Sequence, residues 1–131
     1  SYLIQVSTKP TKQTLGTITV QHAAADGLLD VLKEIAAKER SQLFKADQNG
    51  WRPLHEGARG GNPDVVEYLL KEGAQINERT NHGEGGNALW WAEKGAVTLS
   101  KRYKLCVEIL KKYGGVSLPP KKKPKLVLPK R

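Results

Sequence analysis

The sequence has no methionine, one phenylalanine and one cysteine, Cys106. A single cysteine excludes an internal disulfide and is compatible with a reducing compartment. The longest uninterrupted apolar run is the stretch 88–92, which is too short for a membrane span or a secretory signal. We therefore expect an intracellular protein without a transmembrane segment, whose core consists mostly of Leu, Val, Ile and Ala.

Acidic residues are almost absent from the C-terminal end. Residues 101–131 contain 11 Lys or Arg and one acid, Glu108, whereas residues 1–100 contain 11 Lys or Arg and 12 Asp or Glu. The net charge of +9 therefore resides in the C-terminal part of the chain. Four prolines and no acid follow Gly115, which excludes a regular helix there, so we expect residues 116–131 to form an extended, polyproline-like tail.

The most informative stretch runs from Asp47 to Asn77. It begins with a tight turn, in which Gly50 can adopt the positive φ that such turns need. Pro53 then favours the start of a short helix that reaches Arg59, and the glycine pair 60–61 ends it. These signals predict a turn followed by a short helix.

A second, longer helix is expected to follow. Asn62 is placed to cap its N-terminus, Pro63 occupies its first position, and Gly73 stops it. Its apolar residues fall on one face at helical spacing: Val65, Val66, Leu69 and Leu70. This helix pair cannot bury its apolar face by itself, so we expect it to stack on copies of itself.

This unit resembles an ankyrin repeat. The residues that match the family pattern are Asp47, Gly50, Pro53, Leu54, His55, Ala58, Gly61, Val65, Val66, Leu69, Leu70, Gly73, Ala74 and Asn77. Arg52 stands where the family has Thr, and Gly57 stands where it has Ala. The resemblance implies that His55 makes a hydrogen bond between neighbouring loops.

Weaker copies of the pattern flank the central unit, at an offset of 34 residues upstream and with insertions downstream. We predict helix pairs at 20–26 and 28–38, at 53–59 and 63–72, and at 88–94 and 103–113. Six of the inserted residues fall in the 97–105 region. The sequence thus indicates an all-α ankyrin solenoid of three repeats (14–115), with divergent outer repeats, an N-terminal extension (1–13) and the tail (116–131).

Three features outside the helix pairs can also be interpreted from the sequence. The apolar, β-prone residues 2–6 could pack along the first repeat or add a strand to a partner's sheet. Phe44 is expected to plug the space below the first finger turn. The glycine-rich segment 79–87 forms a longer second finger and lacks the Gly-Lys-Ser/Thr pattern of a phosphate loop.

The residues that usually carry chemistry form no recognisable site. No pair among His22, His55 and His82 has the spacing of a metal site, and Cys106 is expected to be a small buried residue. The carboxylates are scattered. We therefore expect no catalytic residue, no bound metal and no cofactor, and we do not expect an enzyme.

The resemblance implies a concave face, formed by the finger turns and the first helices, that binds a partner protein. Carried over to this sequence, the face includes Gln48, Asn49, Trp51, Glu56, Arg59, Arg79, His82, Glu84, Trp91 and Lys94. Adjacent side chains on a helix point about 100° apart. We expect Trp90 to pack inward against the preceding repeat and Trp91 to face the concave side; alternatively, both cap the array.

The tail carries the candidate anchor residues Lys121, Lys122, Lys123, Lys125, Lys130 and Arg131. This run could act as a nuclear-import signal, attract nucleic acid or an anionic lipid surface, or simply remain solvated. The interleaved apolar residues Leu118 and 126–128 suggest that the tail lies along an apolar groove of its own domain or of a partner.

Two functions of different classes follow. The first is non-enzymatic protein–protein recognition through the concave face and fingers. The alternative is an accessory subunit of a large assembly, such as a ribosome-like or organellar complex, anchored by its basic tail. A third, weaker possibility is one module of an enzyme or of its regulator. Salt dependence separates the first two, because binding to phosphates weakens steeply with salt.

Overall fold

The computed structural model describes residues 18–98 and 100–122. The described residues form helices and 3-10 turns but no β-strand, apart from one isolated antiparallel bridge between Arg79 and Asn87. The elements are α2 (Val20–Ala25), α3 (Leu29–Lys38), η2 (Arg40–Phe44), α4 (Pro53–Arg59), α5 (Pro63–Lys71), η3 (Asn81–Gly83), α6 (Ala88–Ala96) and α7 (Lys101–Lys112). The expectations for residues 1–13 lie outside the described residues.

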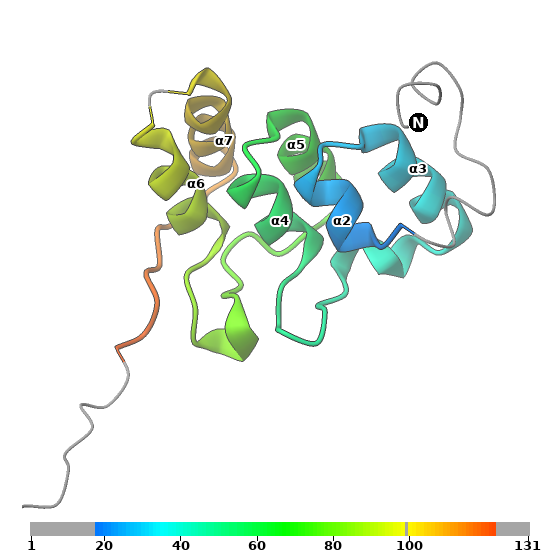
Figure 1. Ribbon diagram of the computed structural model, residues 1–131, viewed down its shortest axis with the longest axis horizontal. Helices are drawn as coiled ribbons and strands as arrows, with labels where there is room; N and C mark the ends of the chain where they lie inside the picture. The colour runs from blue at the N-terminus through cyan, green and yellow to red at the C-terminus, as the bar shows by residue number, and fades with distance from the viewer. Residues whose placement is uncertain (1–17, 99, 123–131) are drawn as a thin grey trace, which may run out of the picture.

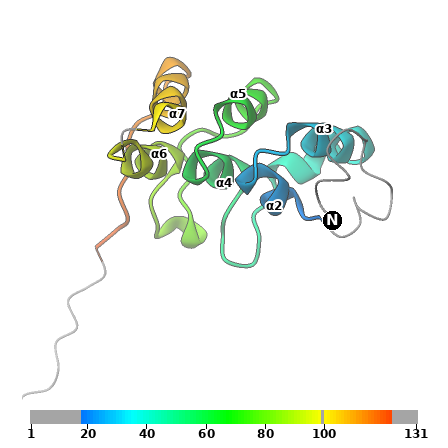
Figure 2. The same cartoon turned by 45° about the horizontal axis from the view of Figure 1, so that its top comes forward.

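Three antiparallel helix pairs stand side by side in two layers (Figures 1 and 2). The first helices α2, α4 and α6 pack on one another in one row, and α5 packs on α7 in the other row. Two fingers project below the first row (Figure 1), the first finger at residues 47–51 leading into α4 and the second finger at residues 79–87 leading into α6. The prediction of an all-α solenoid of stacked helix pairs is confirmed.

The central helix pair supplies the middle of the core. Its expected apolar face is buried, since Val65, Val66 and Leu69 are each 0% exposed and Leu70 is 8% exposed. Gly73 has φ 107°, and the amide of Ala74 donates to the carbonyl of Leu69, so the helix ends where the sequence predicted. The buried core consists of Leu, Val and Ala with Cys106, while isoleucines pack around it half-buried.

Asn62 does not cap α5 with its side chain, and that part of the prediction is wrong. The residue occupies the cap position, but its amide nitrogen crosses to the preceding repeat and donates to the carbonyls of Ala24 and Ala25, at 2.9 and 2.8 Å. These carbonyls lie at the end of α2, where a helix leaves acceptors without intrahelical partners. Asn62 thus ties two repeats together instead of stabilising its own helix.

The insertion in the third repeat lengthens helices rather than a loop. Aligned on the central pair, α6 continues two residues further than α4, and α7 begins three residues earlier than α5. The loop between α6 and α7 gains one residue relative to the loop between α4 and α5. Tyr103 lies in the part of α7 that is added at its start, and its hydroxyl donates to the carbonyl of Arg59 at 2.8 Å. The inserted residues therefore extend the contact between the second and third repeats.

The two fingers contact each other near their tips. The ring Nε2 of His82 donates to the carbonyl of Gln48 at 3.0 Å. Gly50 has φ 77°, and a Cβ built on it would lie 2.2 Å from the backbone nitrogen of His82. Asn81 and His82 both adopt left-handed backbone conformations, with φ of 52° and 55°. The fingers are therefore held close enough to present one surface.

Candidate functional site

Three indole rings from two successive repeats form a contiguous group, which we call the tryptophan row: Trp51, Trp91 and Trp90. Trp51 lies at the end of the first finger, two residues before α4, and the other two lie in the first turn of α6. The ring centroids of Trp51 and Trp91 are 5.0 Å apart, and those of Trp91 and Trp90 are 4.9 Å apart in an edge-to-face arrangement. All three side chains are half-buried, so the row combines fixed geometry with accessible aromatic surface.

The second finger fixes two of these rings by hydrogen bonds. The indole Nε1 of Trp51 donates to the side-chain oxygen of Asn81 at 3.1 Å. The Nε1 of Trp91 donates to the hydroxyl of Thr80 at 3.4 Å, and that hydroxyl itself donates to the carbonyl of Gly86. Because Thr80 is 0% exposed, it forms a rigid support. Hydrogen bonds to the second finger therefore orient Trp51 and Trp91, in addition to the contacts between the rings.

Two cations lie against the faces of the row. The guanidinium carbon of Arg59 is 5.0 Å from the centre of the Trp51 ring, and the Nζ of Lys94 is 5.0 Å from the centre of the Trp90 ring. Such contacts contribute roughly 0.5–1 kcal/mol each at exposed sites. Arg59 also donates to the carboxylate of Glu56, with Nη2 at 2.8 Å from Oε1. The rings thus hold both cations in defined positions.

The predicted packing of Trp90 against the preceding repeat is wrong. The ring contact with the preceding repeat comes from Trp91, which touches Trp51. Trp90 lies over its own second finger, where a Cβ on Gly86 would be 2.3 Å from its ring. Neither ring is fully buried. The side chain of Trp90 is too large for the buried position that His55 occupies in the central repeat, and the glycine makes room for it above the finger.

The structure brings together only part of the predicted concave-face set. Two members, Trp51 and Trp91, belong to the row, and three more lie beside it: Glu56, Arg59 and Lys94. Gln48 and His82 meet at the finger tips through the hydrogen bond described above. Asn49 is exposed and its amide donates to the side chain of Asp47 within the first finger. The backbone of Arg79 is bridged to that of Asn87, and the carbonyl of Glu84 accepts a hydrogen bond from the Lys121 amide of the tail.

The first residues of the tail dock on the second finger. Asn87 is 0% exposed, and its side-chain nitrogen donates to the carbonyl of Val116 at 2.6 Å, while its oxygen accepts from the amide of Leu118 at 3.1 Å. Its backbone amide donates to the carbonyl of Leu118 at 3.0 Å. Further along, the amide of Lys121 donates to the carbonyl of Glu84 at 2.9 Å. Asn87 therefore holds the tail as a neighbouring strand would.

This docking is polar, whereas the sequence suggested an apolar groove. The hydroxyl of Ser117 donates to the carboxylate of Glu93 at 2.5 Å, and the amide of Val116 donates to the side chain of Asn77 at 3.0 Å. Leu118 is only half-buried. Of the predicted anchor residues, Lys121 and Lys122 are exposed on the docked segment. Lys123, Lys125, Lys130 and Arg131 lie outside the described residues, as do residues 126–128.

We expect Asn87→Ala to lower the free energy of unfolding by about 2–3 kcal/mol, because it removes a helix cap and the bonds to the tail. The side-chain oxygen of Asn87 also accepts from the amide of Trp90 at 3.1 Å, which caps α6. Denaturant unfolding measures the change, and hydrogen exchange at the Leu118 amide reports release of the tail. Asn77→Ala removes one exposed bond to the same tail and should cost less than about 1 kcal/mol. Equal losses in the two variants would contradict the role assigned to Asn87.

His55 has the inter-loop role that the resemblance implied. Its Nδ1 accepts from the amide of Arg52 at 2.9 Å, so Nε2 carries the proton and donates to the carbonyl of Glu78 at 2.6 Å. Burial lowers the pKa of His55 below its ordinary value. Because both ring nitrogens are engaged within the chain, the ring has no free position with which to exchange a proton with a ligand.

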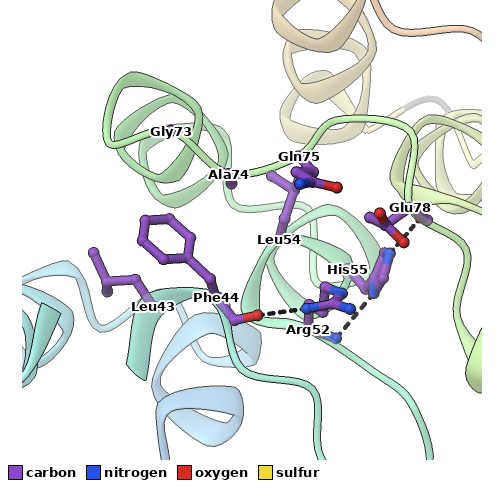
Figure 3. Close-up of a pocket in the computed structure, with 9 residues that line it drawn as sticks. All are labelled: Leu43, Phe44, Arg52, Leu54, His55, Gly73, Ala74, Gln75 and Glu78. Atoms are coloured by element: carbon purple, nitrogen blue, oxygen red, sulfur yellow. Dashed lines mark hydrogen bonds between the residues drawn. The ribbon is translucent and has the colours of Figure 1, made fainter. Parts of the chain in front are cut away.

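A pocket of about 410 Å³ lies beside His55, between the loops that end the first two repeats (Figure 3). Its apolar wall includes Leu43, Phe44 and Leu54. Leu43 is 1% exposed, and Phe44 is half-buried and packs against the core. The guanidinium of Arg52 donates to the Phe44 carbonyl at 2.7 Å. The polar groups that border the pocket thus serve the packing of the loops.

The remaining candidate groups take structural positions. Cys106 is 0% exposed, and burial raises the pKa of its thiol to about 12, so the expectation of a small buried residue is confirmed. Within residues 18–98 and 100–122, no three His, Cys, Asp or Glu side chains are grouped so as to hold a metal ion. No helix in that part of the chain is both long and apolar enough to cross a membrane.

Three residues that form or support this surface were not assigned to it from the sequence. Asn81 supports Trp51, Asn87 holds the tail, and Trp90 extends the row that Trp91 begins. A cap signal was available for Asn87, because asparagine directly precedes the helical segment 88–94. No sequence signal pointed to its contact with the tail, which begins 29 residues later.

The comparisons with known proteins agree with this architecture. A family profile described as ankyrin repeats (3 copies) matches over residues 1–80 and 20–118. The chain is 32% identical over 69 residues to the 26S proteasome non-ATPase regulatory subunit 10 of Rattus norvegicus, a match that covers 53% of this chain and 30% of that protein. The chain spans less than half the length of the curated relatives that it matches.

Two solved structures share the fold. The human ASB11 ankyrin repeat domain superposes with a TM-score of 0.62 at 28% identity, covering 74% of this chain and 40% of that one. A chain of the complex between the predatory endopeptidase Bd0816 of Bdellovibrio bacteriovorus and the immunity protein Bd3460 superposes with a TM-score of 0.61 at 28% identity, covering 82% and 49%. Three stacked helix pairs, inter-repeat bonds from His55 and Asn62, and a profile that spans them all lead to one conclusion: the chain belongs to the ankyrin-repeat family.

Proposed function

We propose that the chain binds another protein through the tryptophan row and the two fingers, without catalysing a reaction. The observation that carries this proposal is the row itself, three indole rings in mutual contact and half-buried. Tryptophan and arginine are enriched among residues that dominate binding energy, and the row combines both types because Arg59 lies on Trp51. Ankyrin repeats are protein-interaction modules, which supports the same conclusion.

The surrounding residues define the extent of the proposed face. Glu56, Arg59, Lys94 and the finger tips at Gln48 and His82 border the row, and we propose that they form its polar rim. Ring orientation set by Thr80 and Asn81 reduces the entropy lost when a partner binds. The structural neighbour from the complex of an endopeptidase with an immunity protein supports a role in protein binding.

Trp91→Ala is expected to weaken binding of a native partner by about 2 kcal/mol or more, because it removes the middle ring of the row. The matched control is Leu105→Ala, which removes a large apolar side chain that is 47% exposed on α7. Affinity capture from lysate with the full chain identifies the partner, and titration calorimetry with the purified partner then compares the three proteins.

Site-specific photocrosslinking gives an independent reading of the same face. A photoreactive residue at Gln48, on the exposed first finger, should crosslink to the captured partner, whereas one at Lys71, exposed at the end of α5, should not. Retained affinity in Trp91→Ala together with crosslinking from Lys71 would place the binding face elsewhere and refute the proposal.

A further inference from the structure

The tryptophan row presents cations rather than bare aromatic faces. Arg59 covers a face of Trp51 and Lys94 covers a face of Trp90, each at 5.0 Å, and both side chains are exposed. Trp90 also rests on Gly86 on the finger side. A flat ring of a ligand would have to displace these cations before it could stack. A carboxylate, in contrast, could approach them where they stand.

The two cations differ in whether a carboxylate of the chain pairs with them. Arg59 is paired with Glu56, but the ion pairs of the described residues do not include Lys94. The carboxylate next to Lys94 in the sequence, Glu93, accepts a hydrogen bond from Ser117 of the tail. Lys94 is therefore a cation that the aromatic ring holds in place and that no carboxylate of the described chain neutralises.

The docked tail adds charge next to this position. Asn87 and Glu93, which hold the tail, belong to the same finger and helix as Trp90 and Lys94. The bond from the Lys121 amide to the Glu84 carbonyl then fixes the point where the lysines begin. Lys121 and Lys122 are exposed there, and Glu84 is the exposed acid beside them. Lys94 on α6 and Lys121 and Lys122 on the docked tail are thus all exposed.

We propose that the tryptophan row, Lys94 and the docked lysines Lys121 and Lys122 form one composite site for an acidic segment of a partner protein. Carboxylates of the segment would bind the lysines, and its apolar side chains would pack on the accessible edges of the indoles. This inference rests on the proposed function and specifies the chemistry of the partner. It also joins the concave face and the tail, which the sequence presented as separate alternatives, into a single surface.

Charge complementarity favours an acidic protein segment over a nucleic acid. Single-stranded nucleic acids bind by stacking bases on open aromatic faces within a positively charged groove. Here cations occupy the faces of Trp51 and Trp90, and residues 1–100, which form most of the repeat body, carry a net charge of −1. The row therefore presents cations where a stacked base would need an open ring face.

The test uses the full chain with two probes of matched charge, an oligoglutamate peptide that contains interspersed leucines and a single-stranded oligouridylate. The chain has 3 tryptophans and all of them lie in the row, so intrinsic fluorescence reports the site directly. We expect the acidic peptide to shift this fluorescence with saturation, and to bind more tightly than the oligouridylate at equal ionic strength.

Matched variants separate the composite site from general attraction to a basic protein. Lys94→Gln should weaken peptide binding about threefold to tenfold, and Lys121→Gln with Lys122→Gln about tenfold, since about 1.4 kcal/mol corresponds to tenfold. The controls Lys101→Gln, and Lys101→Gln with Lys104→Gln, remove the same charge from exposed positions on α7 and should weaken it less than about twofold. Equal losses in variants and controls, or tighter binding of the oligouridylate, would overturn the inference.

Failure here can be told apart from failure of the proposed function. If a native partner depends on Trp91 but its affinity is unchanged by Lys94→Gln and by removal of the tail lysines, the row binds a partner that is not acidic. The composite site is then refuted while the proposed function stands. If neither the row nor the lysines affect any partner, both are refuted.

Discussion

Leu69→Ala is expected to lower the free energy of unfolding by about 2–4 kcal/mol, which is a large fraction of the 5–15 kcal/mol typical of a domain. Leu69 is 0% exposed in α5, which packs against both α4 and α7. The substitution leaves a cavity where two repeats meet. In a short solenoid each repeat is stabilised only by its neighbours, so damage to the central repeat weakens both interfaces at once. Val66→Ala, at a second site that is 0% exposed, should act in the same direction.

Leu105→Ala provides the matched comparison, because it makes the same chemical change at a side chain that is 47% exposed. Its cost should stay within about 1 kcal/mol, since little surface is removed from the core. Chemical denaturation followed by circular dichroism measures both variants. A mild effect of Leu69→Ala, comparable with that of Leu105→Ala, would mean that α5 is not the centre of the cooperative unit.

The helix pairs were predictable because local signals specify them. Proline at the first helical position, glycine after the last one and apolar residues at helical spacing predicted α4 and α5 to within one residue at each end. The end of α6 and the start of α7 were less accurate. An insertion shows in the sequence as a change in the spacing between corresponding residues of two repeats. Whether the insertion lengthens a loop or a helix depends on what the added residues can contact. Here Tyr103 contacts the preceding repeat.

The side chains that cross between distant segments could not be assigned in this way. Asn62 is a residue type that favours the cap position of a helix, yet its side-chain amide forms a hydrogen bond with the end of α2. The side chain of Asn87 forms hydrogen bonds with both its own helix and the tail. These choices depend on how repeats stack, which no local pattern encodes. The same holds for Trp90 and Trp91. Their divergence of about 100° was predictable, but which ring meets Trp51 is decided by how α6 is rotated against α4.

Gly50→Ala should destabilise the protein by about 3 kcal/mol or more, through two additive causes. The residue has φ 77°, a conformation that strains any residue with a Cβ, and the new methyl carbon would lie 2.2 Å from the backbone nitrogen of His82. That contact is with backbone of the opposite finger, so no side-chain rotation can relieve it. The second finger must move away, or the first finger must open.

Gly83→Ala isolates the first cause, because Gly83 has φ 97° and no atom within 4 Å of the position of its Cβ. It should cost about 1–2 kcal/mol from backbone strain alone. Thermal or denaturant unfolding of the two variants gives the difference that belongs to the contact between fingers. If Gly50→Ala costs no more than Gly83→Ala, the fingers are not held together as closely as the structure describes.

The consequence of Gly50→Ala should reach the binding face as well as stability. Trp51 directly follows Gly50, and its indole donates to Asn81, the residue before His82. Moving the fingers apart therefore breaks this hydrogen bond. It also separates Trp51 from Trp91, whose ring centroids lie 5.0 Å apart in the parent chain. We expect the tryptophan emission of folded Gly50→Ala to shift to longer wavelength, while that of Gly83→Ala stays as in the parent chain. Because the row is built from two repeats that the fingers connect, the contact at Gly50 links the stability of the array to the shape of the surface it presents.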